Sequence, residues 1–90
     1  MSTLVAEVGF PVVISTATDT TVCPRPCQCL GFYVSSTTGG TVVIKDGATA
    51  KSGTITPAIG FHKFPVDIGN SLVVTTANTI NCTFFYAGSA

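Results

Sequence analysis

Ionised side chains are scarce in this chain of 90 residues, and they are balanced in sign. Charged residues make up 9% of the sequence, with four cations against four anions and a formal net charge of zero. Nucleic-acid binding normally requires a basic stripe that neutralises phosphates, and four cations scattered from Arg25 to Lys63 do not form one. We therefore expect no nucleic-acid partner. The lack of charge also removes the repulsion that keeps monomers apart, which favours close packing against other protein surfaces.

Long apolar runs and targeting signals are also missing. No run approaches the roughly 20 apolar residues of a membrane span, and residues 1–7 lack the basic start and apolar stretch of a secretory signal. We expect no membrane partner and folding in a host cytoplasm. Hydrophobic residues make up 46% of the chain, which excludes disorder. Ninety residues suffice for one domain, which is only marginally stable without help from partner subunits.

Helix signals are nearly absent, whereas alternation and β-branched residues run through the whole chain. Gly39-Gly40 predicts a hairpin turn between two strands, and Pro11 and Pro65 indicate edge strands. Further turns are predicted at 46–47, 67–70 and 77–79. The strands that remain are predicted at 10–15, 20–22, 28–36, 41–45, 54–56, 59–66, 71–76 and 80–86.

This pattern predicts an all-β fold, a single antiparallel β-sandwich or jelly-roll-like barrel of about seven or eight short strands. No segment can supply the crossover helices of parallel β/α units. We expect one domain over residues 1–90. Residues 1–9 have two interpretations: an arm that adds a strand to a neighbouring subunit, or part of the domain's own sheet or a frayed terminus.

Alternation along the strands predicts which side chains face the core. It places Phe85 and Tyr33 on outward faces, opposite their inward neighbours. Phe85 is either a rim residue covered by a loop or an anchor for another subunit, and two outward aromatics favour an interface. The predicted inward residues of the last strand are Ile80, Cys82, Phe84 and Tyr86.

Four cysteines are the most distinctive feature, and three of them lie in Cys-Pro-Arg-Pro-Cys-Gln-Cys. A zinc site needs four thiolates in a tetrahedron, but this spacing is not the usual paired one. Disulfides are a second interpretation: Cys23 with Cys27 across the prolines, and Cys29 with Cys82 if their strands are neighbours. Reduced core thiols are the third, and we favour these or disulfides formed late in an oxidising medium over metal.

The sequence also lacks the residue patterns of known catalytic sites. His62 is the only histidine, Asp67 lies five residues away, and no nucleophile elbow surrounds any serine or threonine. The carboxylates are dispersed, without calcium-loop spacing. We therefore expect no enzymatic activity, no catalytic residues and no cofactor.

The segments Gly39–Gly47, Gly53–Thr56, Phe64-Pro65 and Asn70–Thr76 carry a resemblance. Together with the terminal strand Asn81–Tyr86, they resemble small β-sandwich virion proteins of tailed bacteriophages. The resemblance covers roughly residues 28–86 and transfers no functional residues. It implies a capsid decoration (cement) protein or a component of a head or tail fibre.

The expected function is therefore a structural virion protein, a decoration protein that stabilises a phage head by binding the lattice of the major capsid protein. It is expected in the virion, after assembly in the host cytoplasm, as a homo-oligomer, either a trimer or a dimer. The alternative is a receptor- or carbohydrate-binding module of a fibre. A small secreted β-sandwich with two disulfides is the third hypothesis.

Overall fold

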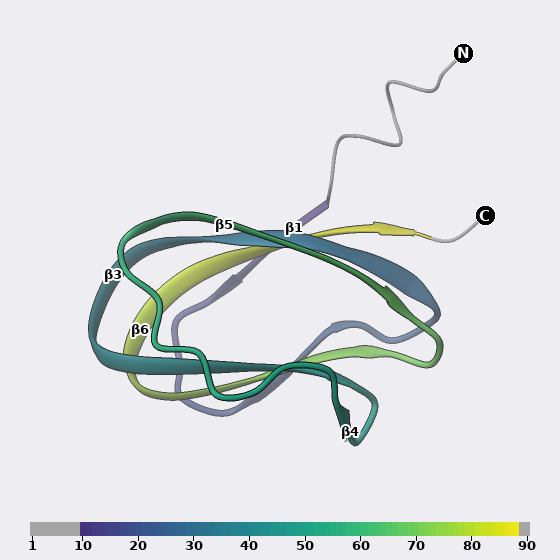
Figure 1. The fold of residues 1–90 in the computed structure, drawn as a ribbon, viewed down its shortest axis with the longest axis horizontal. Helices are drawn as coiled ribbons and strands as arrows, with labels where there is room; N and C mark the ends of the chain where they lie inside the picture. Colours follow the sequence, from purple (N-terminus) through teal and green to yellow (C-terminus); the bar gives the residue numbers. More distant parts are fainter. Residues whose placement is uncertain (1–9, 89–90) are drawn as a thin grey trace, which may run out of the picture.

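Two long strands, β3 (Cys27–Asp46) and β6 (Leu72–Gly88), run through the centre of the fold (Figure 1). The computed structural model describes residues 10–88, which form one antiparallel sheet of six strands without a helix. The predicted arm at residues 1–9 lies outside the described residues. The other strands are β1 (Phe10–Ile14), β2 (Asp19–Cys23), β4 (Thr49–Ala50) and β5 (Gly60–Ile68).

The pairing divides the sheet into two halves. β3 and β6 pair along almost their whole lengths, from Cys27 opposite Gly88 to Asp46 opposite Leu72. In what we call the first half, β1 pairs with the end of β6 and β5 with the start of β3. In the second half, β2 pairs with the start of β6 and β4 with the end of β3. Each half is thus four strands wide, and β1, β2, β4 and β5 are edge strands.

The sheet folds back on itself between the halves, as the shared curve of β3 and β6 shows (Figure 1). Bulges interrupt the register of β3 near Ser35 and Thr38. Gly39 (φ 66°) and Asn78 (φ 62°) both adopt left-handed conformations at this bend, and the Asn78 amide donates to the Gly39 carbonyl at 2.9 Å. Such bulges and left-handed residues bend both strands without breaking the ladder between them.

Glycine is required at the next position of this bend. A Cβ at Gly40 would lie 2.5 Å from Cβ of Ile80 and 2.8 Å from the Thr79 carbonyl oxygen. The backbones of β3 and β6 approach closely there because residue 40 has no side chain.

The predicted hairpin turn at Gly39-Gly40 is therefore wrong, and so is the turn at 77–79. Both are bends inside continuous strands, because β3 keeps β6 as its neighbour on both sides of the bend and does not return beside itself. The predicted strand at 54–56 shrinks to one bridge, Ile55 with Val42. The number of strands falls from the seven or eight predicted to six. The edge positions of Pro11 and Pro65 are confirmed, since β1 pairs only with β6 and β5 only with β3.

The core lies between the facing halves. Phe32 and Phe84 stack at its centre with ring centroids 4.7 Å apart, and both are almost completely buried. The predicted inward face of the last strand is confirmed: Tyr86 is partly buried against the core, and the other three residues are buried. The second half contributes Val22, Val42, Ile44, Leu72 and Val74.

One buried polar side chain fastens the break between β1 and β2. The Thr76 hydroxyl donates to the Thr16 carbonyl at 3.0 Å and accepts from the Thr18 amide at 3.3 Å. The buried hydroxyl therefore has a hydrogen-bond partner both as a donor and as an acceptor.

Two short connections lie at the end of the folded sheet opposite the bend and lead from one half to the other. Residues 24–26 join β2 to β3, and residues 69–71 join β5 to β6. The Asp46 carboxylate accepts backbone hydrogen bonds from Gly69 and Asn70, both at 2.9 Å, and from Ser71 at 3.4 Å. These bonds, the one from Gly69 most of all, lower the pKa of Asp46. The ionised carboxylate thus holds the second connection in place.

Candidate functional site

The exposed large apolar side chains gather on one part of the molecule. Among residues 10–88 they lie in β1, in the start of β3, and at or just before β5, so all belong to the first half. They are Phe10, Val13, Tyr33, Ile59 and Phe61. No large apolar side chain of the second half is exposed within the described range.

The strand register arranges several of these residues in a row. Val13 lies opposite Thr83, Thr83 opposite Tyr33, and Tyr33 opposite Phe61. Side chains directly opposite each other share a face of the sheet, and the buried neighbours Phe32 and Phe84 show that this face points away from the core. Val13 is 66% exposed, Tyr33 44% and Phe61 57%. The row crosses all four strands of the first half.

A second row lies beside the first, formed by Pro11, Phe85, Gly31 and Lys63. The ring centroid of Phe85 lies 6.2 Å from that of Phe61. A Cβ at Gly31 would lie 3.1 Å from Cζ of Phe61 and 2.5 Å from the His62 carbonyl oxygen. The ring of Phe61 therefore lies over the bare backbone of Gly31 and reaches toward Phe85.

We call Pro11, Val13, Tyr33, Phe61 and Phe85 the outer apolar face. Lys63 carries the only charge in its two rows at neutral pH. The next groups on one side are uncharged: the Ser35 hydroxyl donates to the Asn81 carbonyl at 3.1 Å. On the other side, the Gln28 amide donates to Asp67 at 3.1 Å.

The two interface residues predicted from the sequence, Tyr33 and Phe85, lie in adjacent rows of this face. Phe85 is half-buried, and its ring lies near that of Phe61 on the edge strand β5. Alternation alone did not identify Val13 and Phe61. In β5 both faces carry aromatic residues, Phe61 on one and Phe64 on the other, so the outward one is known only once β5 is paired with β3.

The cysteines lie on the core side of the sheet, and all four are buried free thiols. The thiol of Cys23 lies at the end of β2, where it donates to the Arg25 carbonyl at 3.4 Å. Burial, with a side-chain hydrogen bond that Cys27 donates to Cys23, raises the pKa of Cys27 to about 12. Burial likewise raises the pKa of Cys29 and of Cys82 to about 11. Thiols with such pKa values hold their protons at neutral pH, which makes them poor nucleophiles.

The structure does not bring Cys82 to the other three cysteines. Cys82 lies opposite Val34, whereas Cys29 lies opposite Tyr86. Four residues along β6 correspond to roughly 13 Å, about twice the Cα separation that a disulfide spans. Among residues 10–88, no three His, Cys, Asp or Glu side chains gather in an arrangement that could hold a metal ion.

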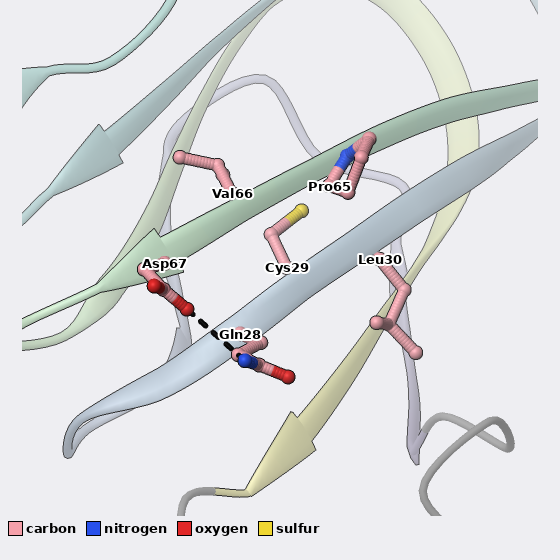
Figure 2. A pocket seen from close by; sticks show the side chains of 6 residues that line it. All are labelled: Gln28, Cys29, Leu30, Pro65, Val66 and Asp67. Atoms are coloured by element: carbon pink, nitrogen blue, oxygen red, sulfur yellow. Dashed lines mark hydrogen bonds between the residues drawn. The ribbon is translucent and has the colours of Figure 1, made fainter.

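A small open hollow of about 260 Å³ lies between the start of β3 and the end of β5 (Figure 2). Its lining includes Leu30, which occupies the bulge in β3, and Pro65, and the hydrogen bond from Gln28 to Asp67 crosses it. Ligand pockets typically measure about 300–1,000 Å³ and bury most of their ligand. The hollow falls below that range, so it gives little support to a small-molecule site.

His62 and the aspartates are bound to other partners. The His62 ring stacks on Phe32 with centroids 5.1 Å apart, and its Nε2 lies 2.7 Å from the Ala58 carbonyl oxygen. Asp19 accepts from the Thr75 hydroxyl at 2.7 Å, on the other half of the sheet. The arrangement of the described residues thus offers a surface for contact more readily than a centre for chemistry.

Comparison of the chain with protein-family models, with curated proteins and with solved structures finds no match. Within residues 10–88 there is no helix that is long and apolar enough to cross a membrane. The outer apolar face is therefore the feature on which a functional proposal rests.

Proposed function

We propose that this chain is a structural protein without enzymatic activity, which coats a virus particle as a capsid decoration protein. The observation that carries the proposal is the outer apolar face. It lies on the solvent side of a sheet whose other side already forms the core, so folding does not require it to be apolar. An apolar surface that folding does not need is typical of an interaction site.

The size of the face supports this proposal. Aromatic side chains present about 150–250 Å² each, so Tyr33 and Phe61 at about half exposure leave roughly 200 Å² in water. Val13, Pro11 and Phe85 extend this area across the sheet. The largest apolar patch of a soluble monomer is about 300–600 Å², and such patches are often functional.

The partner we propose is the lattice of the major capsid protein. A shell offers many identical sites, and a coat of linked copies binds them with high avidity even when each contact is weak. A surface with few charges suits this role, since little desolvation opposes close packing. We also propose that the folded-over sheet belongs to the β-sandwich or jelly-roll class, in which two layers enclose the core.

Particles of a virus whose genome encodes this chain provide the test. After purification and a wash at high salt, quantitative mass spectrometry should find the chain at a copy number comparable to that of the major capsid protein. Gold-labelled antibody should decorate the outside of intact heads. Absence of the chain from washed particles, or a gene that lies apart from capsid and portal genes, would contradict the proposal.

A carbohydrate- or receptor-binding role is the second candidate, and one observation favours it. Tyr33 and Phe61 lie side by side on an exposed sheet face, where sugar rings can stack on aromatic side chains. Pull-down on insoluble polysaccharides with the native chain and the Tyr33→Ala variant distinguishes the two. Binding that Tyr33→Ala abolishes supports the second candidate over the first.

A further inference from the structure

We infer that the outer apolar face is covered by a second copy of the same chain, in a two-fold dimer. The axis runs parallel to the strands, between β3 and β6, so that β1 of one copy lies over β5 of the other. This inference rests on the proposed function, because the proposed coat consists of linked copies: the dimer supplies that link, and other surfaces of the two copies then meet the lattice.

Side-chain size is the first argument, since this axis places large residues over small ones. Phe61 of one copy faces Val13 of the other, and Tyr33 faces Thr83. In the second row, Phe85 faces the position of Gly31, where the Phe61 ring of that copy provides an aromatic surface. Two sheets pack well when their facing side chains interdigitate in this way.

Charge is the second argument. A face that meets its own copy must not place like charges together, because such contacts are repulsive. Lys63 is the only cation in the two rows, and it lies on the edge strand β5. The axis places Lys63 of one copy over β1 of the other. The two lysines are then roughly 14 Å apart, three strand spacings, which exceeds the Debye length at physiological salt.

Hydrogen bonding is the third argument. The uncharged groups in and beside the rows, Thr83, Ser35 and Asn81, can each both donate and accept. Such groups can bond to the groups that face them across the two-fold axis, whether those donate or accept, whereas a face of acceptors alone could not. The face thus complements itself in size, charge and hydrogen bonding.

The area indicates a weak dimer. Four strands and the length of β1 give a contact of about 20 by 17 Å, a flat area of roughly 340 Å² on each copy. The total of roughly 700 Å² lies below the range of stable interfaces and is typical of a transient one. We therefore expect a dissociation constant on the order of tens of micromolar, so that the dimer forms at the high local concentration of a coat.

Mixed cross-linking of two full-length variants, Val13→Cys and Phe61→Cys, tests the arrangement. Each variant is first shown by circular dichroism to fold, and the two are mixed at about 200 µM under mild oxidation with diamide, a concentration several times above a dissociation constant of tens of micromolar. The mixture should form the disulfide-linked pair at least ten times faster than either variant alone, because Val13 faces Phe61 and not Val13. The buried native thiols of Cys27, Cys29 and Cys82 should react slowly by comparison.

Thr21→Cys mixed with Phe61→Cys is the matched control, since Thr21 is exposed on the outer side of the second half. Thr83→Cys with Tyr33→Cys is a second test pair should Phe61→Cys not fold. Equal cross-linking of test and control pairs, or light scattering that shows a monomer or a trimer at about 200 µM, several times above the expected dissociation constant, overturns the inference. The particle assay remains separate: a chain that stays monomeric yet coats heads overturns only the dimer, and a dimer absent from particles overturns only the proposed function.

Discussion

The two halves of the folded sheet have similar inner faces and different outer faces. Both inner faces are apolar and buried, and each supplies part of one core. On the outside, the first half exposes Val13, Tyr33 and Phe61. The corresponding surface of the second half carries Asp19 hydrogen-bonded to Thr75, with a half-buried Val43 between polar neighbours.

This difference separates what the fold requires from what it does not. A single sheet that folds over needs two apolar inner faces, and both halves satisfy that need. Either outer face could be polar without loss of the core, and that of the second half exposes no large apolar side chain among residues 10–88. The apolar outer face of the first half is therefore the part of the molecule most readily explained by a partner.

The largest effect is expected from truncating a side chain on an inner face. Phe84→Ala should lower the free energy of unfolding by about 3–5 kcal/mol, because it leaves a cavity beside Phe32 at the centre of the core. That loss is a large fraction of the roughly 5–15 kcal/mol available to a small domain. The adjacent Phe85→Ala, on the outer face, should cost only about 1 kcal/mol. Urea unfolding followed by circular dichroism measures both, and equal losses would contradict the assignment of the two faces.

The bend that brings the halves together can be tested at Gly40. Gly40→Ala should lower the free energy of unfolding by about 1–3 kcal/mol, since the added methyl group collides with Ile80 and the Thr79 backbone. Gly53→Ala is the control, because a methyl group there meets no atom within 4 Å. Thermal unfolding of the two variants provides the measurement, and a Gly40→Ala variant as stable as the native chain would argue against the close approach of β3 and β6.

The same substitution, valine to threonine, can be made on the outer face of each half to compare their contributions to self-association. Val13→Thr should weaken self-association about five-fold, corresponding to roughly 1 kcal/mol of lost apolar contact. Val43→Thr, on the second half, should leave self-association unchanged. Sedimentation equilibrium gives both dissociation constants. An equal effect of the two substitutions would mean that the first half has no special role.

A smaller effect is expected at the connection between the halves, and it depends on pH. The pKa of Asp46 is lowered in the folded chain, so its carboxylate stabilises the fold above the unfolded pKa of about 3.9, and this stabilisation is lost as the pH falls through the lower folded pKa. The difference in urea midpoint between the native chain and Asp46→Asn should be constant above about pH 5 and shrink below pH 4. Val43→Thr is the control: it changes no titrating group, so its urea midpoint should differ from that of the native chain by the same amount at every pH. A pH-independent difference for Asp46→Asn would contradict the role assigned to the Asp46 carboxylate.

Much of the sheet is predictable from local sequence, because alternation and edge prolines depend on neighbouring residues alone. The inward residues of β6 and the edge position of β5 follow from such signals. The continuity of β3 through Gly39 and Gly40 cannot be predicted from local signals, since two glycines are equally suited to a hairpin turn and to a bend within a strand. The partner strand decides between them, and Asn78 bends that partner at the same place.

The candidate face was predictable only in part, for a related reason. Tyr33 and Phe85 lie between buried neighbours, so their outward direction follows from alternation. Val13 and Phe61 join them through the pairing of both edge strands, which brings together residues 48 positions apart. Contacts of this kind depend on register, which no local pattern specifies.

The central claim is that the outer apolar face of the first half binds another protein surface, beginning with its own copy. Static light scattering of the native chain and of Phe61→Thr, from about 5 to 500 µM, brackets a dissociation constant of tens of micromolar and tests this claim most directly. The account predicts a native mass that rises from one chain to two over this range, and a variant that stays close to one chain. A native protein that remains a monomer throughout, or a variant that associates as strongly as the native chain, would contradict it.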